Sequence, residues 1–414
     1  MPAPEQRATA PGQRGAEPET GSVWRVPGMP WLLAAATLWF SGYALLVSVA
    51  PLWAIRGGSD SLGAGLVTAV MMACTVLAQL SMRRLLAAAG WRWTLVLGSV
   101  LLGLPALGHL ASDRLWAVTA LAAPRGLGFG VITVCGATAV AAFVEPRRRG
   151  RAIGALGLAS AAPQFVLVPL APWLAERGGF SLVFVLAVLP VLAVPLAWPI
   201  ARAAGDTDRA PAGGHGREPA DRRRALRHAL AGPVAALVVI TASGGAILTF
   251  APHLLASPAR TFWGLLAFTG AAAASRWGVG GIADRLGPVP ALAPLLFTGA
   301  LGLAGIGLGA DGPDGAGRRA LAVAGLLLAG VAYGGLQNLT LAQAFIAAGE
   351  PARSTVSVAW NLSFDAGTGL GAFATGAVAA ATSYPAAFGV LAVVAGLVGA
   401  GWVRPGRGYR GRAG

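Results

Sequence analysis

Apolar segments of helix length follow one another along almost the whole chain, and short polar stretches separate them. A membrane-spanning helix needs about 20 consecutive, mostly apolar residues. Because the bilayer interior offers backbone groups no partner outside their own helix, each segment is predicted to be α-helical. The alternating pattern of about ten residues that a membrane strand requires does not occur. Twelve membrane-spanning segments are predicted, at residues 30–54, 62–82, 93–111, 115–143, 151–174, 180–201, 229–255, 262–282, 288–310, 320–347, 354–381 and 384–403.

A polar stretch at residues 202–228 divides these segments into two groups of six, and we expect it to be a cytoplasmic linker. The fold is therefore predicted to be all-α and integral to the membrane, with two six-helix pseudo-symmetric halves at 30–201 and 229–403. Residues 1–29 lack the apolar core of a cleavable signal, so a disordered cytoplasmic tail is expected there. Residues 404–414 are predicted to form a basic cytoplasmic tail.

The composition also favours a membrane protein. The chain is 56% hydrophobic and only 11% charged, whereas soluble proteins carry roughly 25% charged residues. All 31 basic residues are arginine, and most of them face the cytoplasm if the N-terminus is placed there. The positive-inside rule thus predicts a multi-pass cell-membrane protein with both termini in the cytoplasm. The net charge of +15 is then explained by orientation and contact with anionic lipids, and nucleic acid is not an expected partner.

The residues that enzymes and motors need are missing from the sequence. Without lysine, the chain has no conventional P-loop for ATP. Its four histidines are scattered and form no H-E-x-x-H motif, so neither a metal site nor an enzyme is predicted. Cys74 and Cys135 lie inside apolar segments, where we expect buried, hydrophobic side chains. No cofactor is expected.

One polar string between two apolar segments, Gly280–Gly287, reads G-G-I-A-D-R-L-G. It resembles the G-x-x-x-D-R-x-G loop of the major facilitator superfamily of secondary transporters. Pro146–Gly154 resembles another turn of that superfamily, Arg125–Gly130 resembles its intramembrane arginine motif, and Asn361–Gly371 resembles the eleventh helix of bacterial efflux members. The resemblance implies twelve helices, a monomer, and a substrate site near the midplane between the halves.

The loop itself contributes Gly280, Asp284, Arg285 and Gly287, for which the resemblance implies a conformational role. An Asp there can accept hydrogen bonds from a neighbouring helix N-terminus, where the macrodipole favours negative charge. Breaking that contact would accompany the switch to the inward-open state. A solvated surface loop is the alternative.

The sequence departs from the family pattern at three places. In the first copy of the loop, aligned on Gly90, alanine replaces the Asp. The fifth segment retains only Val168–Ala171 of the antiporter-type motif, and neither the first nor the fourth segment contains an acidic residue. These departures leave uptake open as an alternative to antiport.

Charged residues inside apolar segments are the first candidates for function, because burying a charge in a membrane is costly. Arg125 lies about 15 Å into its segment, where the resemblance implies a role in proton coupling or the substrate path; tying carbonyls together is the alternative. Asp365 lies at similar depth, and a low-dielectric environment favours the neutral form of a carboxyl group. It could exchange a proton or pair with a cationic substrate, or simply bond neighbouring helices. Asn361 adds a polar group one turn earlier. Arg276 also falls within a span but received no role.

A second set of candidates would line a cavity suited to an amphipathic organic solute. Its members are Trp39, Phe40, Tyr43, Thr249, Phe250, Tyr333, Gln337 and Asn338. Lipid contact or core packing is the alternative for the aromatic residues among them. Gly367, Gly369 and Gly371 are expected to permit close helix packing, and His109 and His253 to be solvated at the membrane surface.

The function predicted from these features is secondary active transport by alternating access, with proton-coupled export of a small organic molecule as the leading hypothesis. Proton- or ion-coupled uptake of a small solute is the alternative within transport. A membrane scaffold or sensor that has lost transport is the alternative of a different class.

Overall fold

The computed structural model describes residues 26–145, 148–205, 220–255, 257–310, 315–349 and 353–403. All secondary structure within these ranges is helical. The first part of the chain forms α1 (Met29–Val47), α2 (Val49–Arg56), α3 (Ser61–Gly103), the 3-10 helix η2 (Leu104–Leu110), α4 (Leu115–Phe143), α5 (Arg149–Gly178), α6 (Phe180–Leu186), the 3-10 helix η4 (Leu189–Leu196) and α7 (Ala197–Ala203). The second part forms α8 (Ala220–Leu254), α9 (Pro258–Leu286), α10 (Val289–Ala310), α11 (Ala316–Ala348), α12 (Arg353–Ala381) and α13 (Tyr384–Val403).

The described residues include nine helices that are long and apolar enough to cross a membrane, rather than the twelve expected. Part of the difference lies in α3, which runs continuously from the second predicted segment into the third. Its backbone leaves helical geometry at Gly90, with φ 65° and ψ 176°, so α3 is two helices joined at a kink. The helices α9 and α12 have 29 residues each but are not among the nine.

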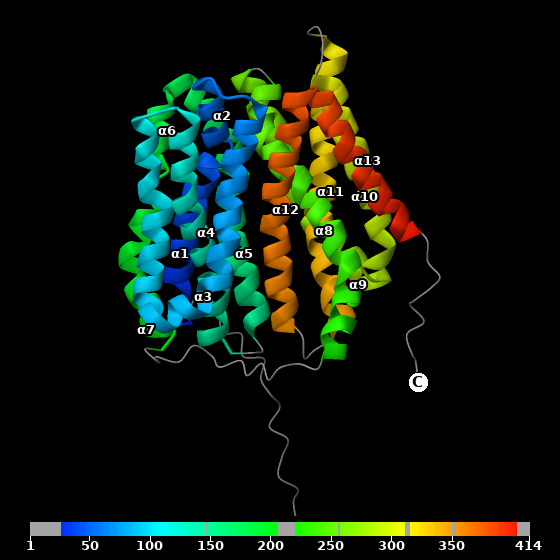
Figure 1. Cartoon of the computed structure of the whole chain (residues 1–414). Helices are drawn as coiled ribbons and strands as arrows, with labels where there is room; N and C mark the ends of the chain where they lie inside the picture. The colour runs from blue at the N-terminus through cyan, green and yellow to red at the C-terminus, as the bar shows by residue number, and fades with distance from the viewer. Residues whose placement is uncertain are drawn as a thin grey trace, which may run out of the picture.

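Two groups of helices stand side by side, α1–α7 and α8–α13 (Figure 1). The helices α1, α5, α8 and α12 begin at one end of the bundle, the lower end in Figure 1, and we use that name below. The groups meet where α3 packs against α12, α5 against α9, and α2 against α8. The predicted tails lie largely outside the described residues, as does most of the linker, although α8 already begins at Ala220.

The helix α12 approaches its neighbours closely through glycine. A Cβ atom at Gly371 would lie 2.1 Å from the carbonyl oxygen of Ala242 on α8, and one at Gly367 would lie 2.1 Å from Thr241 Oγ1. On another face, a Cβ at Gly369 would lie 2.8 Å from a side-chain atom of α3. These glycines therefore occupy positions where any larger residue would push α12 away from α8 or from α3.

Candidate functional site

A hydrogen bond between the two groups of helices marks the centre of the candidate site. The Asp365 side chain on α12 is buried, and its Oδ2 accepts a hydrogen bond of 2.7 Å from Gln79 Nε2 on α3. The same Gln79 nitrogen lies 3.4 Å from Thr133 Oγ1 on α4. Gln79 Oε1 is buried and has no partner within the described structure. The carboxyl group thus joins the two halves through one amide, and that amide has a spare acceptor.

The polar side chains around Asp365 share a level in the bundle. Counting 1.5 Å per residue, Asp365 lies about 18 Å from the start of α12 at the lower end. Gln79 lies about 16 Å from the kink of α3, Gln337 about 16 Å from the end of α11, and Arg276 about 15 Å from the end of α9. These groups therefore lie deep within the span rather than at its surface.

On the side of the first half, three aromatic rings form a cluster. Tyr43 on α1 stacks on Phe129 of α4, with ring centroids 4.2 Å apart and an interplanar angle of 12°. Phe40 meets the same Phe129 edge-on at 5.6 Å. Tyr43 is within electrostatic range of Asp365 and of Tyr333 on the second half. Phe129 was not predicted, although it lies four residues after Arg125.

The second half presents a matching aromatic wall. Tyr333 on α11 lies 6.4 Å from Phe364 on α12, and Phe364 lies 5.4 Å from Trp360, measured between ring centroids. Tyr333 is within electrostatic range of both Asp365 and Arg276. Asn361 is exposed one turn before Asp365, and its amide donates to the Ser357 carbonyl at 2.8 Å.

Arg276 joins this group, although the sequence analysis gave it no role. Its Nη2 donates to Oε1 of Gln337, and its carbonyl oxygen accepts from Asn338 Nδ2 at 3.0 Å. The two predicted amides of α11 thus hold an arginine of α9 from both its side chain and its backbone. Arg276 is exposed, whereas Gln337 is buried. A lone charge in an apolar segment, the signal that identified Arg125, could also have identified Arg276.

Arg125 has a different environment inside the first half. Its side chain is 1% exposed, and its guanidinium donates to the carbonyls of Leu102, at 2.9 Å, and Gly42, at 3.1 Å. The arginine therefore ties α1 to the end of α3, and both of its hydrogen bonds in the described structure go to backbone carbonyls.

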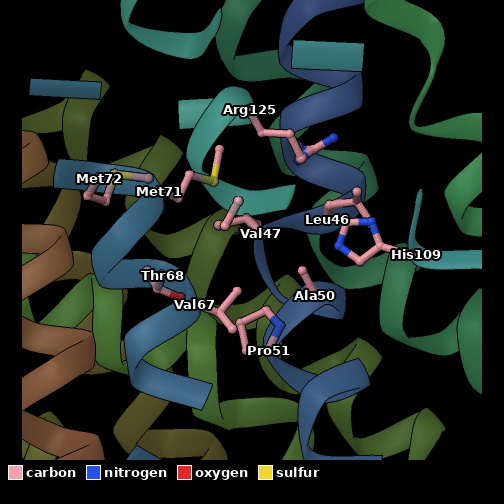
Figure 2. A pocket seen from close by; sticks show the side chains of 11 residues that line it. Leu46, Val47, Ala50, Pro51, Val67, Thr68, Met71, Met72, His109 and Arg125 are labelled. Atoms are coloured by element: carbon pink, nitrogen blue, oxygen red, sulfur yellow. The ribbon is translucent and has the colours of Figure 1, made fainter. Parts of the chain in front are cut away.

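His109 does not lie at a solvated surface, as the sequence analysis expected. It is 1% exposed, with Nδ1 3.1 Å from the Ala106 carbonyl and its ring 5.1 Å from that of Phe184. Packing of η2 against α6, which carries Phe184, buries it. Figure 2 shows His109 and Arg125 at one small pocket between α1, α3 and α4, with room for about one water molecule.

Three other predicted cavity residues lie elsewhere. Trp39 is buried within the first half, where Nε1 donates to Ser99 Oγ at 2.8 Å. Thr249 and Phe250 lie within about 8 Å of the upper end of α8. There the hydroxyl of Thr249 bonds that of Thr68 on α3 at 2.9 Å, a second link between the halves. The structure therefore does not bring these three residues close to Asp365.

The string Gly280–Gly287 is not a loop along most of its length. The helix α9 continues to Leu286, so Gly280, Asp284 and Arg285 belong to its last turns. Gly287 follows with φ 77°, a backbone conformation that suits glycine and ends the helix. Arg285 is exposed beside an open groove of about 450 Å³, which Gly278 and Gly281 also line. The side chain of Asp284 lies outside the described residues.

Metal binding finds no support in the described part of the chain. It contains no group of three or more His, Cys, Asp or Glu side chains placed to hold an ion. Both cysteines are free. The chemistry available at the site is therefore that of one carboxyl group, one guanidinium, amides and aromatic rings.

The sequence pattern of the Major Facilitator Superfamily matches residues 31–372, which is most of the chain. This chain belongs to the major facilitator superfamily. A comparison with curated proteins finds no match. As a superfamily member the protein is a transporter and not an enzyme, and its apolar helices make it a multi-pass membrane protein.

Solved structures of other transporters share the fold of this superfamily member. The peptide transporter POT in complex with sulfate is 15% identical, with a TM-score of 0.72 over 91% of this chain and 94% of that chain. The inward-facing, unoccupied bacterial homolog of the human lysosomal transporter Spinster is 14% identical, with a TM-score of 0.70 over 91% and 95%. The nucleoside transporter NupG is 10% identical, with a TM-score of 0.64 over 91% and 98%.

Proposed function

We propose that this chain is a secondary active transporter that exports a small organic molecule in exchange for protons, by alternating access between its two halves. The observation that carries the proposal is the hydrogen bond from Gln79 to Asp365. It places an ionisable carboxyl group deep in the span and at the contact between the halves. Family membership and the transporter neighbours support transport itself.

Asp365 is the proposed coupling group because its charge and its contact with the other half are linked. As a carboxylate, Asp365 accepts the hydrogen bond of Gln79. When it is protonated, it gains an O–H donor, for which the unpartnered Gln79 Oε1 is an acceptor. Gain or loss of the proton therefore changes the hydrogen bonds between α3 and α12.

We further propose twelve spans in two six-helix halves, with 30–201 and 229–403 related by pseudo-symmetry. The kink at Gly90 makes two spans of α3, and α9 and α12 are long enough to cross despite their polar residues. On this proposal the protein is a monomer in the cell membrane, in contact with its lipids. The lower end, at which α1 begins, is cytoplasmic together with both termini.

The substrate would bind between the two aromatic clusters, beside Asp365. Phe40 and Tyr43 would contact it from the first half, and Tyr333, Gln337 and Asn338 from the second, with Asn361 nearer the lower end. At the upper end, the Thr68–Thr249 bond would have to break when the path opens there. The end of α9 from Gly280 to Gly287, with Asp284 and Arg285, is proposed to move between states.

The test uses purified protein in liposomes that contain a trapped pH-sensitive dye. Candidate compounds are added, and proton movement is compared between wild type and Asp365→Asn. Proton flux that one class of compound triggers, and that the variant loses, supports coupled transport through Asp365. Flux that survives in Asp365→Asn contradicts the proposed coupling group and leaves Arg125 as the next candidate.

The direction of transport, and whether the protein is a transporter or a scaffold, are tested in the same preparation. Preloaded substrate that leaves the liposomes against an opposing proton gradient supports exchange, whereas accumulation in step with protons supports uptake. A preparation in which no compound moves and no proton flux appears favours a scaffold or sensor.

A further inference from the structure

We propose that Arg276 is the anion-binding subsite of the substrate site, and that the cargo is an organic anion with a carboxylate or phosphate group beside an aromatic body. This inference rests on the proposed function, because it names the substrate class of that same site.

The position of Arg276 within the span is energetically costly. A guanidinium within the span is unfavourable unless it is paired or hydrated. Its side-chain partner is Gln337, a neutral amide. Within the described part of the chain, no carboxylate forms an ion pair with Arg276; Asp365 bonds Gln79 instead. An arginine side chain has five N–H donors in a planar fork, so most of this fork remains available to a ligand.

A second, independent donor lies beside the fork. The Gln337 side chain is 4% exposed, and its Nε2 makes no hydrogen bond of good geometry in the described structure, although the Tyr333 side chain interacts with this amide. An unpaired buried N–H group costs free energy of its own. Because Gln337 Oε1 accepts from the guanidinium, its amide nitrogen lies within the same cluster. An anion with two or three oxygens could accept hydrogen bonds from both residues.

The cluster is held in place and accessible. The hydrogen bond from Asn338 to the Arg276 carbonyl joins α9 to α11 at the level of the guanidinium. A Cβ at Gly280 would lie 3.8 Å from that same Asn338 amide, so the two helices remain close one turn further on. Arg276 is exposed, whereas Asp365 is 6% exposed. The charge that a ligand meets in this conformation is therefore positive.

The chemistry of the rest of the ligand follows from the neighbouring rings. Tyr333 is within electrostatic range of Arg276, and its ring leads to Phe364 and Trp360 at centroid distances of 6.4 and 5.4 Å. A flat apolar body can lie against these rings while its acid group reaches the fork. Guanidinium groups bind carboxylates and phosphates in a bidentate manner, so neutral and cationic analogues of the same body should bind more weakly.

The test measures binding without a proton gradient, on full-length protein in nanodiscs of phosphatidylcholine. Benzoate and benzyl phosphate are the anionic probes, and benzyl alcohol and benzylamine are the matched neutral and cationic ones. Titration calorimetry is performed on wild type, Arg276→Gln and Arg276→Lys, with Arg319→Gln as the control. Arg319 is an exposed arginine near the start of α11, at the upper end of the bundle and far from Arg276 along the helix axis.

We expect the anionic probes to bind wild type and the control alike, and at least tenfold more weakly to Arg276→Gln. Arg276→Lys should bind with intermediate affinity because it keeps the charge but not the fork. Comparable melting temperatures without ligand establish that the variants are folded. Equal binding of all four probes, or unchanged binding to Arg276→Gln, would overturn the proposal.

Two further arms separate other outcomes. Nanodiscs with added phosphatidylglycerol test whether a lipid headgroup is the anion. If this lipid weakens the binding of benzyl phosphate to wild type but does not change its binding to Arg276→Gln, the site is a lipid site and the proposed cargo is wrong. If the anions bind through Arg276 but drive no proton movement in liposomes, the proposed function fails while the subsite stands.

Discussion

Gln79 and Asp365 lie on different halves of the molecule, yet their side chains are joined by a hydrogen bond of 2.7 Å deep within the span. The donor belongs to the second apolar segment of the chain and the acceptor to the eleventh. No feature of either segment alone shows that they meet.

Removing the donor of this pair should destabilise the protein. In Gln79→Leu, the buried carboxylate loses its hydrogen bond, at a cost of about 1–3 kcal/mol. Thermal unfolding in detergent measures this change. Adding Asp365→Leu should recover part of the loss, because it removes the unpaired group. Gln164→Leu is the control, since the Gln164 amide bonds only the carbonyl of Ser160 one turn away in the described structure. Equal losses in Gln79→Leu and the control would contradict the importance of the pair.

Replacing Arg125 should also cost stability, because its guanidinium donates to two backbone carbonyls. Arg125→Leu leaves the oxygens of Leu102 and Gly42 without this donor, and we expect a loss of about 3–6 kcal/mol from two such bonds to a charged group. Arg125→Lys should lose less. The readout is the fraction of folded protein after heating, measured by size-exclusion chromatography. A stable Arg125→Leu protein that loses only transport would show that the arginine acts in coupling instead.

Glycine substitutions on two helices should have opposite signs. Alanine favours a helix over glycine by about 1 kcal/mol, so Gly396→Ala on α13, where a Cβ meets no atom within 4 Å, should be neutral or stabilising. Gly371→Ala should instead cost about 1–3 kcal/mol through overpacking, because its Cβ would lie 2.1 Å from the Ala242 carbonyl. Melting temperatures measured side by side test the contrast. Similar shifts in both variants would mean that α12 can move away from α8.

A cross-link between Thr68 and Thr249 should block transport. Their hydroxyls are 2.9 Å apart, so cysteines at the two positions come within reach of a disulfide. The background replaces Cys74 and Cys135 by alanine. Oxidation of Thr68→Cys/Thr249→Cys should lower transport at least tenfold, and a reductant should restore it, while either single cysteine stays active. Full activity of the oxidised pair would show that the halves need not separate at this point.

The sequence predicted the positions of most helices, but not where each of them ends or how they connect. Hydrophobicity alone located the spans, since only a helix satisfies the backbone in a bilayer. It could not show that helix continues past residue 82 as far as Gly90, because Arg83 and Arg84 are as compatible with a helix that emerges from the membrane as with a loop. Nor could it show that Gly280–Leu286 completes α9, since polar residues are compatible with a helix that emerges from a membrane.

The site was predicted in part for the same reason. Asp365, Tyr43 and Tyr333 lie within electrostatic range of one another, as a shared site requires. Arg125 and Arg276 give the same signal in sequence, but one bonds carbonyls and the other an amide beside the interface. Which face of a helix carries a residue, and what the facing helix offers, depends on packing between segments that are distant in the chain.

The bonds of Arg125 also bear on how the protein can move. The guanidinium connects α1 to the end of α3, and Trp39 adds a hydrogen bond from α1 to Ser99, one turn earlier in the same helix. Because of these hydrogen bonds, the first half would move as one rigid body, with little change in the packing of its own helices. The Gln79–Asp365 and Thr68–Thr249 hydrogen bonds connect side chains of different halves, and such bonds can break without exposing backbone groups. A mutation inside a half would then change stability alone, whereas one between the halves, such as Gln79→Leu, would also change the balance between the inward- and outward-open states.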